Sequence, residues 1–131
     1  MEQFIKSQSG QTLIEVVAGI GLLVIVVTAL IGMGVVALKT STSARNRTVA
    51  AKLASEGMEI ARSVRDQGNL GDVDAAHFPA DNTTVGSVTF TRAWTISDAG
   101  TGKKKIIVTV SWPESSGTKS TSVTSYLTDW R

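Results

Sequence analysis

The hydrophobic residues divide the chain into one long apolar run and a remainder in which apolar and polar positions recur periodically. Residues 16–38 carry no charge, and Thr28 has the only polar side chain among them. A helix of about 20 residues crosses the roughly 30 Å hydrocarbon core of a bilayer. A buried core helix is rarely apolar on every face, and a secretory signal peptide has a shorter run followed by a small-residue cleavage site. The pattern predicts a membrane-spanning helix.

Beyond this run the pattern changes to that of an amphipathic helix over residues 39–67. Apolar residues recur at spacings of four, seven and four on one stripe: Val49, Leu53, Ile60 and Val64. This spacing places them on one helix face, with Gly57 as a point of close approach. We therefore expect one helix from about Thr12 to Asp66, which would be about 80 Å long at about 1.5 Å per residue.

The C-terminal part predicts β structure after a loop. Residues 68–84 are rich in Gly, Asp and Asn and have no period, which is typical of a loop. In residues 85–131, apolar and polar side chains alternate as in β-strands over two strong runs and a weaker third run at residues 120–127. The segments 98–102 and 113–117 between these runs have the composition of hairpin turns. The expected fold is α+β, a long N-terminal helix with a small antiparallel sheet packed on its C-terminal half.

Composition narrows the function classes only slightly. The formal charge of +2 does not favour a nucleic-acid partner, and the lack of cysteine excludes disulfides and thiolate metal sites. Charges around the apolar run pose a problem of orientation, because only Lys6 precedes it whereas four basic residues follow it: Lys39, Arg45, Arg47 and Lys52. The positive-inside rule alone would place the C-terminal part in the cytoplasm.

The residues before the apolar run form a motif. They read S-G-Q-T-L-I-E-V, and Glu15 stands directly against the apolar run. Acidic residues at such positions usually have a partner or a function, although a carboxylate at headgroup level in the first helical turn is the simpler reading. The motif resembles the processing site of type IV prepilins and type II secretion pseudopilins. The segment A-A-K-L-A-S-E-G-M-E-I-A-R-S-V-R-D further resembles PilV-like minor pilins.

The resemblance implies a division of the chain and a role for three residues. Residues 1–10 would be a leader, 11–38 the transmembrane and assembly helix, and 39–67 its amphipathic continuation. Cleavage would fall between Gly10 and Gln11, Gln11 would be N-methylated, and Glu15 would pair with the new α-amine of a neighbouring subunit during assembly. Gln11 departs from the usual Phe or Met, and its cyclisation would remove the amine; Gly32 replaces a proline common in major pilins.

The resemblance also implies partners and location. The leader would stay in the cytoplasm and the C-terminal domain outside, on a protein that crosses the cytoplasmic membrane once and enters a pilus or pseudopilus. Its partners would be itself and other pilin subunits, a prepilin peptidase, an inner-membrane assembly platform and membrane lipid. The alternative is a monomeric membrane-anchored binding module for adhesion or DNA uptake.

Other candidate chemistry is sparse, and we expect neither an enzyme nor a cofactor or resident metal. His77 is the only histidine and reads as an exposed loop residue. Three loop carboxylates could in principle bind calcium, but they lack EF-hand spacing: Asp72, Asp74 and Asp81. Arg92 with Lys103–Lys105 is a weak candidate for DNA contact, and Asn46 and Asn82 each begin a glycan acceptor pattern.

Overall fold

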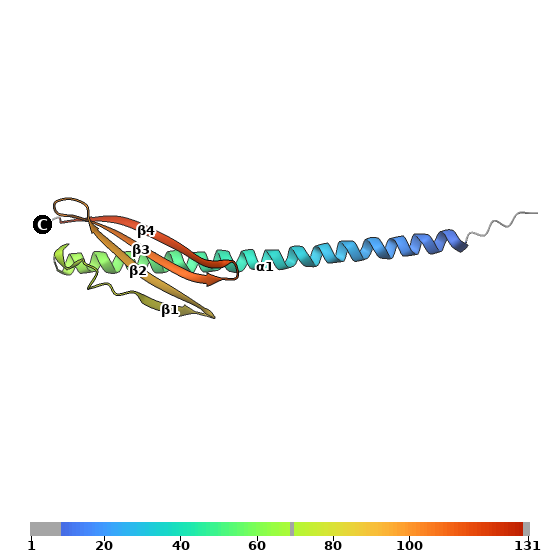
Figure 1. Cartoon of the computed structure of the whole chain (residues 1–131), viewed down its shortest axis with the longest axis horizontal. Coiled ribbons are helices and arrows are strands. Elements are labelled where there is room, and N and C mark those ends of the chain that lie inside the picture. Colours follow the sequence, from blue (N-terminus) through green and yellow to red (C-terminus); the bar gives the residue numbers. More distant parts are fainter. Residues whose placement is uncertain (1–8, 69, 130–131) are drawn as a thin grey trace, which may run out of the picture. The chain divides into compact units, whose positions relative to one another are not determined.

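The computed structural model describes residues 9–68 and 70–129 (Figure 1). Its longest element is helix α1, Ser9–Gln67, which confirms the expected continuous helix and begins three residues earlier than predicted. A 3₁₀ turn η1, Leu70–Asp72, follows, and then four strands: β1 Asp81–Val85, β2 Val88–Asp98, β3 Lys103–Glu114 and β4 Gly117–Thr128. The predicted α+β class is therefore correct. The chain divides into a first unit, residues 1–41, and a second unit, residues 42–131.

The first unit is helical throughout its described residues and has no core of its own. Every side chain from Thr12 to Ser41 is exposed, and its large apolar residues are between 45% exposed at Val27 and 72% at Leu38. This part of α1 reaches a mean hydropathy of 2.8, which makes it long and apolar enough to cross a membrane. The first unit therefore supplies a hydrophobic helix that no described part of the unit covers.

The second unit contains an antiparallel meander in the order β1-β2-β3-β4 (Figure 1). Two-residue turns join β1 to β2 and β3 to β4, and positive φ at Gly86 (64°) and Gly117 (111°) explains why glycine occupies these hairpins. The strands predicted by alternation and the turn at 98–102 are confirmed, while β3 continues through Pro113 and Glu114. Residues 42–67 of α1 pack against one face of this sheet, with the shared core between them.

The core places different helix residues inward from those expected. The fully buried helix positions are small residues and one methionine: Ala50, Ala54, Ala61 and Met58. Val49, Leu53 and Val64 pack at the margins, and Ile60 is 39% exposed, so its assignment to the buried stripe was wrong. The helix turns its alanines to the sheet because the large side chains of the interface come from the strands, including Phe90 and Trp112. Small residues on the helix thus face large residues on the strands, which lets the two surfaces interdigitate.

The predicted loop is shorter than expected and partly structured. Strand β1 covers residues 81–85, so it begins inside the segment 68–84 that was predicted to be a loop. The sheet therefore starts before the predicted boundary at residue 85. Its residues alternate between half-buried and exposed, although only Val85 is apolar. Hydrophobic alternation therefore gave no signal for this strand. Leu70, Val73 and Phe78 are buried, so the connection before β1 also contributes to the core.

Candidate functional site

The residues that the sequence singles out for processing lie at the beginning of α1. Gly10 and Gln11 fall within the first helical turn, but their side chains lie outside the described residues, as do residues 1–8 with Lys6. Glu15 is exposed one turn beyond Gln11, a spacing of four that places two helix residues on the same face. Cleavage, methylation and the assembly role of Glu15 stay predictions.

The first unit exposes a long apolar surface. It includes all the large apolar side chains from Leu13 to Leu38, and none of them is buried. A soluble monomer rarely exposes a continuous apolar patch of this extent, because water solvates it poorly. The surface therefore requires lipid or other protein as its surroundings.

Glycines interrupt this surface and leave the helix backbone accessible. A β-carbon added at Gly19, Gly21, Gly32 or Gly34 would meet no other atom within 4 Å. In an apolar environment such positions let two helices approach closely, because no side chain separates their backbones. The same helix contains Thr28, whose hydroxyl donates to the Val24 carbonyl oxygen at 2.7 Å and is thereby satisfied without an external partner.

In the second unit the main polar cluster surrounds the buried guanidinium of Arg92. Arg92 Nε and Nη2 donate to the Asp81 carboxylate at 3.0 and 2.6 Å, and Nη1 donates to the Leu53 carbonyl oxygen at 3.2 Å. Glu56 lies 3.6 Å from the same Nη1. The guanidinium is also 5.0 Å from the ring centroid of Trp94, which is within cation–π range. Arg92 thus joins β1, β2 and α1.

Arg92 is therefore a structural residue inside the fold. The hydrogen bonds to Asp81 raise its pKa above the usual value and outweigh the opposing effect of burial. A buried charge needs this degree of pairing, because an unpaired guanidinium in the core would be strongly destabilising. Only 7% of Arg92 is exposed, so little of this residue is accessible for a contact with DNA.

Gly57 and Trp94 form a second contact beside this cluster. Trp94 Nε1 donates to the Gly57 carbonyl oxygen at 3.2 Å, and the Trp94 ring lies 5.7 Å from the Phe78 ring between centroids. A β-carbon on Gly57 would approach Val108 Cγ1 to 2.9 Å and Arg92 Cδ to 3.0 Å. The predicted close approach at Gly57 is confirmed, and the element that lies close to the helix there is the sheet.

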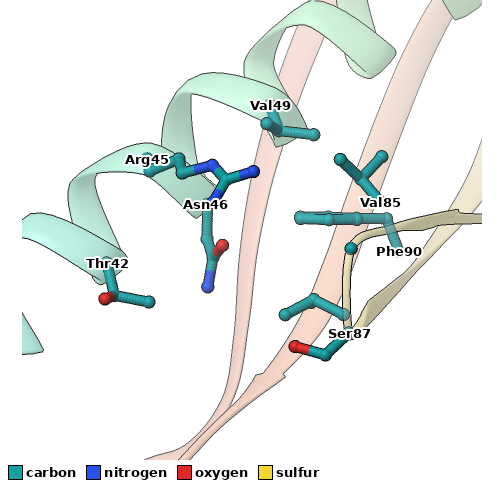
Figure 2. Close-up of a pocket in the computed structure, with 9 residues that line it drawn as sticks. Thr42, Arg45, Asn46, Val49, Val85, Ser87 and Phe90 are labelled. Carbon is teal, nitrogen blue, oxygen red and sulfur yellow. The ribbon is translucent and has the colours of Figure 1, made fainter.

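A small cavity lies between the beginning of the second unit's helix and the β1–β2 hairpin (Figure 2). Its volume is about 80 Å³, enough for a few water molecules. The Asn46 amide points into this space, with Thr42 and Ser87 near its rim and Phe90 on its apolar side. Asn46 is only 9% exposed, so its glycan acceptor pattern is sterically blocked, whereas Asn82 is exposed on β1.

The acidic residues of the 70–81 segment have separate partners. Asp74 Oδ1 accepts hydrogen bonds from the backbone N–H groups of Ala76 and His77, and lies 2.8 Å from His77 Nδ1. The side-chain contact with His77 is the largest of the effects that lower the Asp74 pKa. His77 is exposed, as expected, and Asp81 pairs with Arg92. Within residues 9–68 and 70–129, no three acidic or histidine side chains gather into a metal-binding group.

Comparisons with known proteins give no relative for this chain. No protein-family model matches it, and neither a curated protein nor a solved structure is significantly similar. The candidate residues of this chain therefore rest on its hydrophobic pattern and its N-terminal motif alone. The Arg92 cluster escaped sequence reasoning because Arg92 interrupts an otherwise apolar alternation in β2 and its partner Asp81 lies eleven residues away.

Proposed function

We propose that this chain is a pilin-like structural subunit that is processed at its N-terminus and polymerises through its N-terminal helix. A membrane peptidase would cut between Gly10 and Gln11, and the mature subunit would leave the bilayer to enter a type IV pilus or a type II secretion pseudopilus. The motif from Ser9 to Val16 is the basis for cleavage, and the exposed apolar helix is the basis for polymerisation.

Glu15 is the observation that carries the proposal. It is an exposed carboxylate at the beginning of a helical segment that has no further charge until Lys39. When the helix enters hydrocarbon or a bundle of apolar helices, an unpaired carboxylate costs a few kcal/mol. A free α-amine at Gln11 of a neighbouring copy would supply the opposite charge, and attraction between the two is strong where water is excluded. The pairing would set the axial register of one helix against the next.

The remaining surface of the N-terminal helix suits the same role. Its glycines allow close packing of neighbouring helices, and its large aliphatic side chains provide the apolar contact area. In the second unit, the sheet of the same chain already covers one face of α1. The part of α1 in the first unit therefore remains open to other copies.

The first experiment determines the mature N-terminus by mass spectrometry of the protein from a host that contains prepilin peptidase. The expected product lacks residues 1–10 and begins at Gln11, with or without a methyl group or the 17 Da loss of cyclisation. A Gly10→Val variant should stay uncut. An uncut parent chain would refute processing and, with it, the route to assembly.

The second experiment tests assembly with Glu15→Ala. Membrane insertion should persist, because the substitution makes the segment more apolar, while filament yield should fall by at least tenfold. Glu15→Asp should restore part of that yield, and Glu59→Ala is the matched control because Glu59 is an exposed glutamate of the second unit. Filaments at parental level in Glu15→Ala would contradict the assembly role of Glu15, whereas a parent chain that forms no filaments would favour the alternative, a monomeric membrane-anchored binding module.

A further inference from the structure

The sheet has two open edges that differ in length. In the order β1-β2-β3-β4, the five-residue strand β1 forms one edge and the twelve-residue strand β4 forms the other. No other strand among residues 9–68 and 70–129 pairs with either outer side. Open edges of this kind present unpaired N–H and C=O groups to the surroundings and can template pairing with another chain.

The hydrogen-bonding pattern determines which residues present these groups on β4. Asp129 N–H donates to the Gly102 carbonyl oxygen at 2.9 Å, which continues the β3–β4 ladder by one bonded pair. Bonded and non-bonded pairs alternate in an antiparallel ladder. Odd-numbered residues of β4 therefore bond β3, and even-numbered residues direct their backbone groups to the open edge. Those even residues also carry the side chains of the sheet's outer face, such as Thr124 and Tyr126.

The same reasoning applies to β1. The two-residue turn at Gly86 and Ser87 closes the hairpin with a bonded pair at Val85 and Val88. Odd-numbered residues of β1 therefore bond β2, which leaves the backbone groups of Asn82 and Thr84 open, and both side chains are exposed on the outer face. The open residues of the two edges thus lie on the same face of the sheet, as an even number of strands requires.

Strand β4 also lacks the features that usually protect an edge. It has no proline, and its single charge, Lys119, is on an odd-numbered residue, so the open outer row consists of neutral side chains. Natural monomers commonly guard long edges with charges, prolines or short strands. A twelve-residue edge without these guards is expected to have a partner in the functional state.

We propose that β4 of one copy pairs antiparallel with β1 of a neighbouring copy, joining their sheets. Copies inserted in one membrane in one orientation present β4 and β1 to each other with opposite strand directions, which is the geometry of an antiparallel ladder. The shared orientation of the copies follows from the proposed function, so this inference rests on that proposal. Pairing of β4 with β4 about a twofold axis perpendicular to the sheet would instead reverse one copy relative to the other.

Side-chain matching favours one register. Setting Thr84 opposite Thr124 also sets Val85 opposite Val123, two half-buried valines on the inner face, and Asn82 opposite Tyr126. Cross-strand hydroxyl and aliphatic pairs of this kind stabilise sheets, and no like charges face each other. The contact is head to tail, so it repeats from copy to copy and extends an assembly beyond a dimer.

Disulfide cross-linking tests this arrangement directly because the parent chain has no cysteine. Full-length Thr84→Cys/Thr124→Cys is expressed in the assembling host, oxidised and separated without reductant. Cα atoms of a bonded antiparallel pair lie about 5.5 Å apart, within the range that a disulfide bridges. We expect a ladder of dimers, trimers and larger species. Thr84→Cys/Thr95→Cys is the matched control, because Thr95 is exposed on the same face but belongs to the internal strand β2.

A backbone variant gives a second readout. Tyr126→Pro, introduced into the double-cysteine chain, removes one outward N–H without removing a bond to β3, and it should lower the cross-linked fraction about two- to tenfold. Tyr126→Ala keeps the N–H and should lower it less. Equal ladders from the proline and alanine variants would contradict backbone pairing at this edge.

The outcomes separate this inference from the proposed function. Filaments of the double-cysteine chain without a ladder would overturn edge pairing and leave the pilin-like function in place. Dimers from Thr124→Cys alone, at the yield of the double variant, would also overturn it by indicating β4–β4 pairing. A ladder among membrane-inserted chains that never form filaments would support edge pairing and count against the proposed function. The absence of both ladder and filaments would overturn both.

Discussion

Trp94 and Gly57 are joined by a hydrogen bond that only a close approach of sheet and helix permits. The indole N–H of Trp94 lies 3.2 Å from the Gly57 carbonyl oxygen, and a β-carbon on Gly57 would be 3.3 Å from Trp94 Cζ2. The distance to Val108 Cγ1 would be shorter still, at 2.9 Å. The glycine therefore sets the separation between α1 and strands β2 and β3 in the second unit.

Gly57→Ala should destabilise the second unit by about 1 kcal/mol, because overpacking costs about 1–3 kcal/mol while alanine gains about 1 kcal/mol of helix propensity. The free energy of unfolding is measured on the full chain in detergent by chemical denaturation. Gly71→Ala is the matched control, since a β-carbon there would meet nothing within 4 Å. A Gly57→Ala chain that is more stable than the parent by the full propensity gain of about 1 kcal/mol would contradict the close approach.

Asp81→Asn should weaken the attachment of β1 to the sheet. The variant keeps one acceptor oxygen but removes the charge that two Arg92 nitrogens contact, so we expect a loss of about 1–3 kcal/mol. Arg92→Met in the Asp81→Asn background removes the buried charge as well and should recover part of the stability. Additive losses in this double-mutant cycle would show that the two residues are not coupled.

Glu114 provides a pH-dependent contribution. The hydrogen bond from Trp112 Nε1, 2.8 Å from Glu114 Oε1, is the main cause that lowers the Glu114 pKa, and Ser43 also donates to this carboxylate. A lowered folded-state pKa means that the ionised carboxylate stabilises the fold above its unfolded pKa, about 4.3 for a glutamate. That contribution is lost as pH falls through the folded pKa.

Glu114→Gln should accordingly be less stable than the parent chain at pH 7, and the difference should shrink as pH falls through the lowered folded-state pKa of Glu114. Thermal unfolding of both full-length chains between pH 3 and pH 7 measures this convergence. Glu59→Gln serves as the control for loss of an exposed glutamate. A stability difference that stays constant over this range would contradict a role for the ionised Glu114.

The sequence could predict most of the fold because each correct element has a local signal. The uncharged run and the stripe containing Val49 predict a helix, and alternation around Phe90 and Val108 predicts strands. Strand β1 has no such signal, since Val85 is its only apolar residue and its Asp81 pairs with Arg92 of the next strand. Ile60 was misassigned because periodicity identifies a stripe but not which of its positions the sheet covers.

The candidate site divides in the same way. Gly10, Gln11 and Glu15 were found by a contiguous motif, and the roles proposed for them would depend on other molecules rather than on contacts within the chain. The open edges of β1 and β4 could not be found from the sequence, because strand order and bonding parity arise only when the four strands pair. Asn46 and Asn82 have similar local patterns, yet packing buries one and leaves the other exposed.

Treatment of the purified, folded protein with an oligosaccharyltransferase and its lipid-linked glycan donor should separate these two asparagines. Intact-mass and peptide analysis should find a glycan on Asn82 and none on Asn46, because an oligosaccharyltransferase needs an accessible amide. Asn82→Gln should abolish the modification, and Asn46→Gln should leave it unchanged. A glycan on Asn46 in the folded protein would contradict its burial against the β1–β2 hairpin.

Lys104 should anchor the segment that leads from α1 to β1. Its Nζ donates to the Val73 carbonyl oxygen at 2.8 Å and to that of Gly71 at 3.4 Å. Lys104→Met keeps the aliphatic stem but removes both charged hydrogen bonds, so amide exchange in residues 70–78 should become about tenfold faster. The measurement is hydrogen exchange with mass spectrometry on the full chain. Lys103→Met is the matched control because Lys103 is the exposed neighbour of Lys104 on the same strand. Equal acceleration of exchange in both variants would assign the effect to lost surface charge instead of to the two backbone contacts of Lys104.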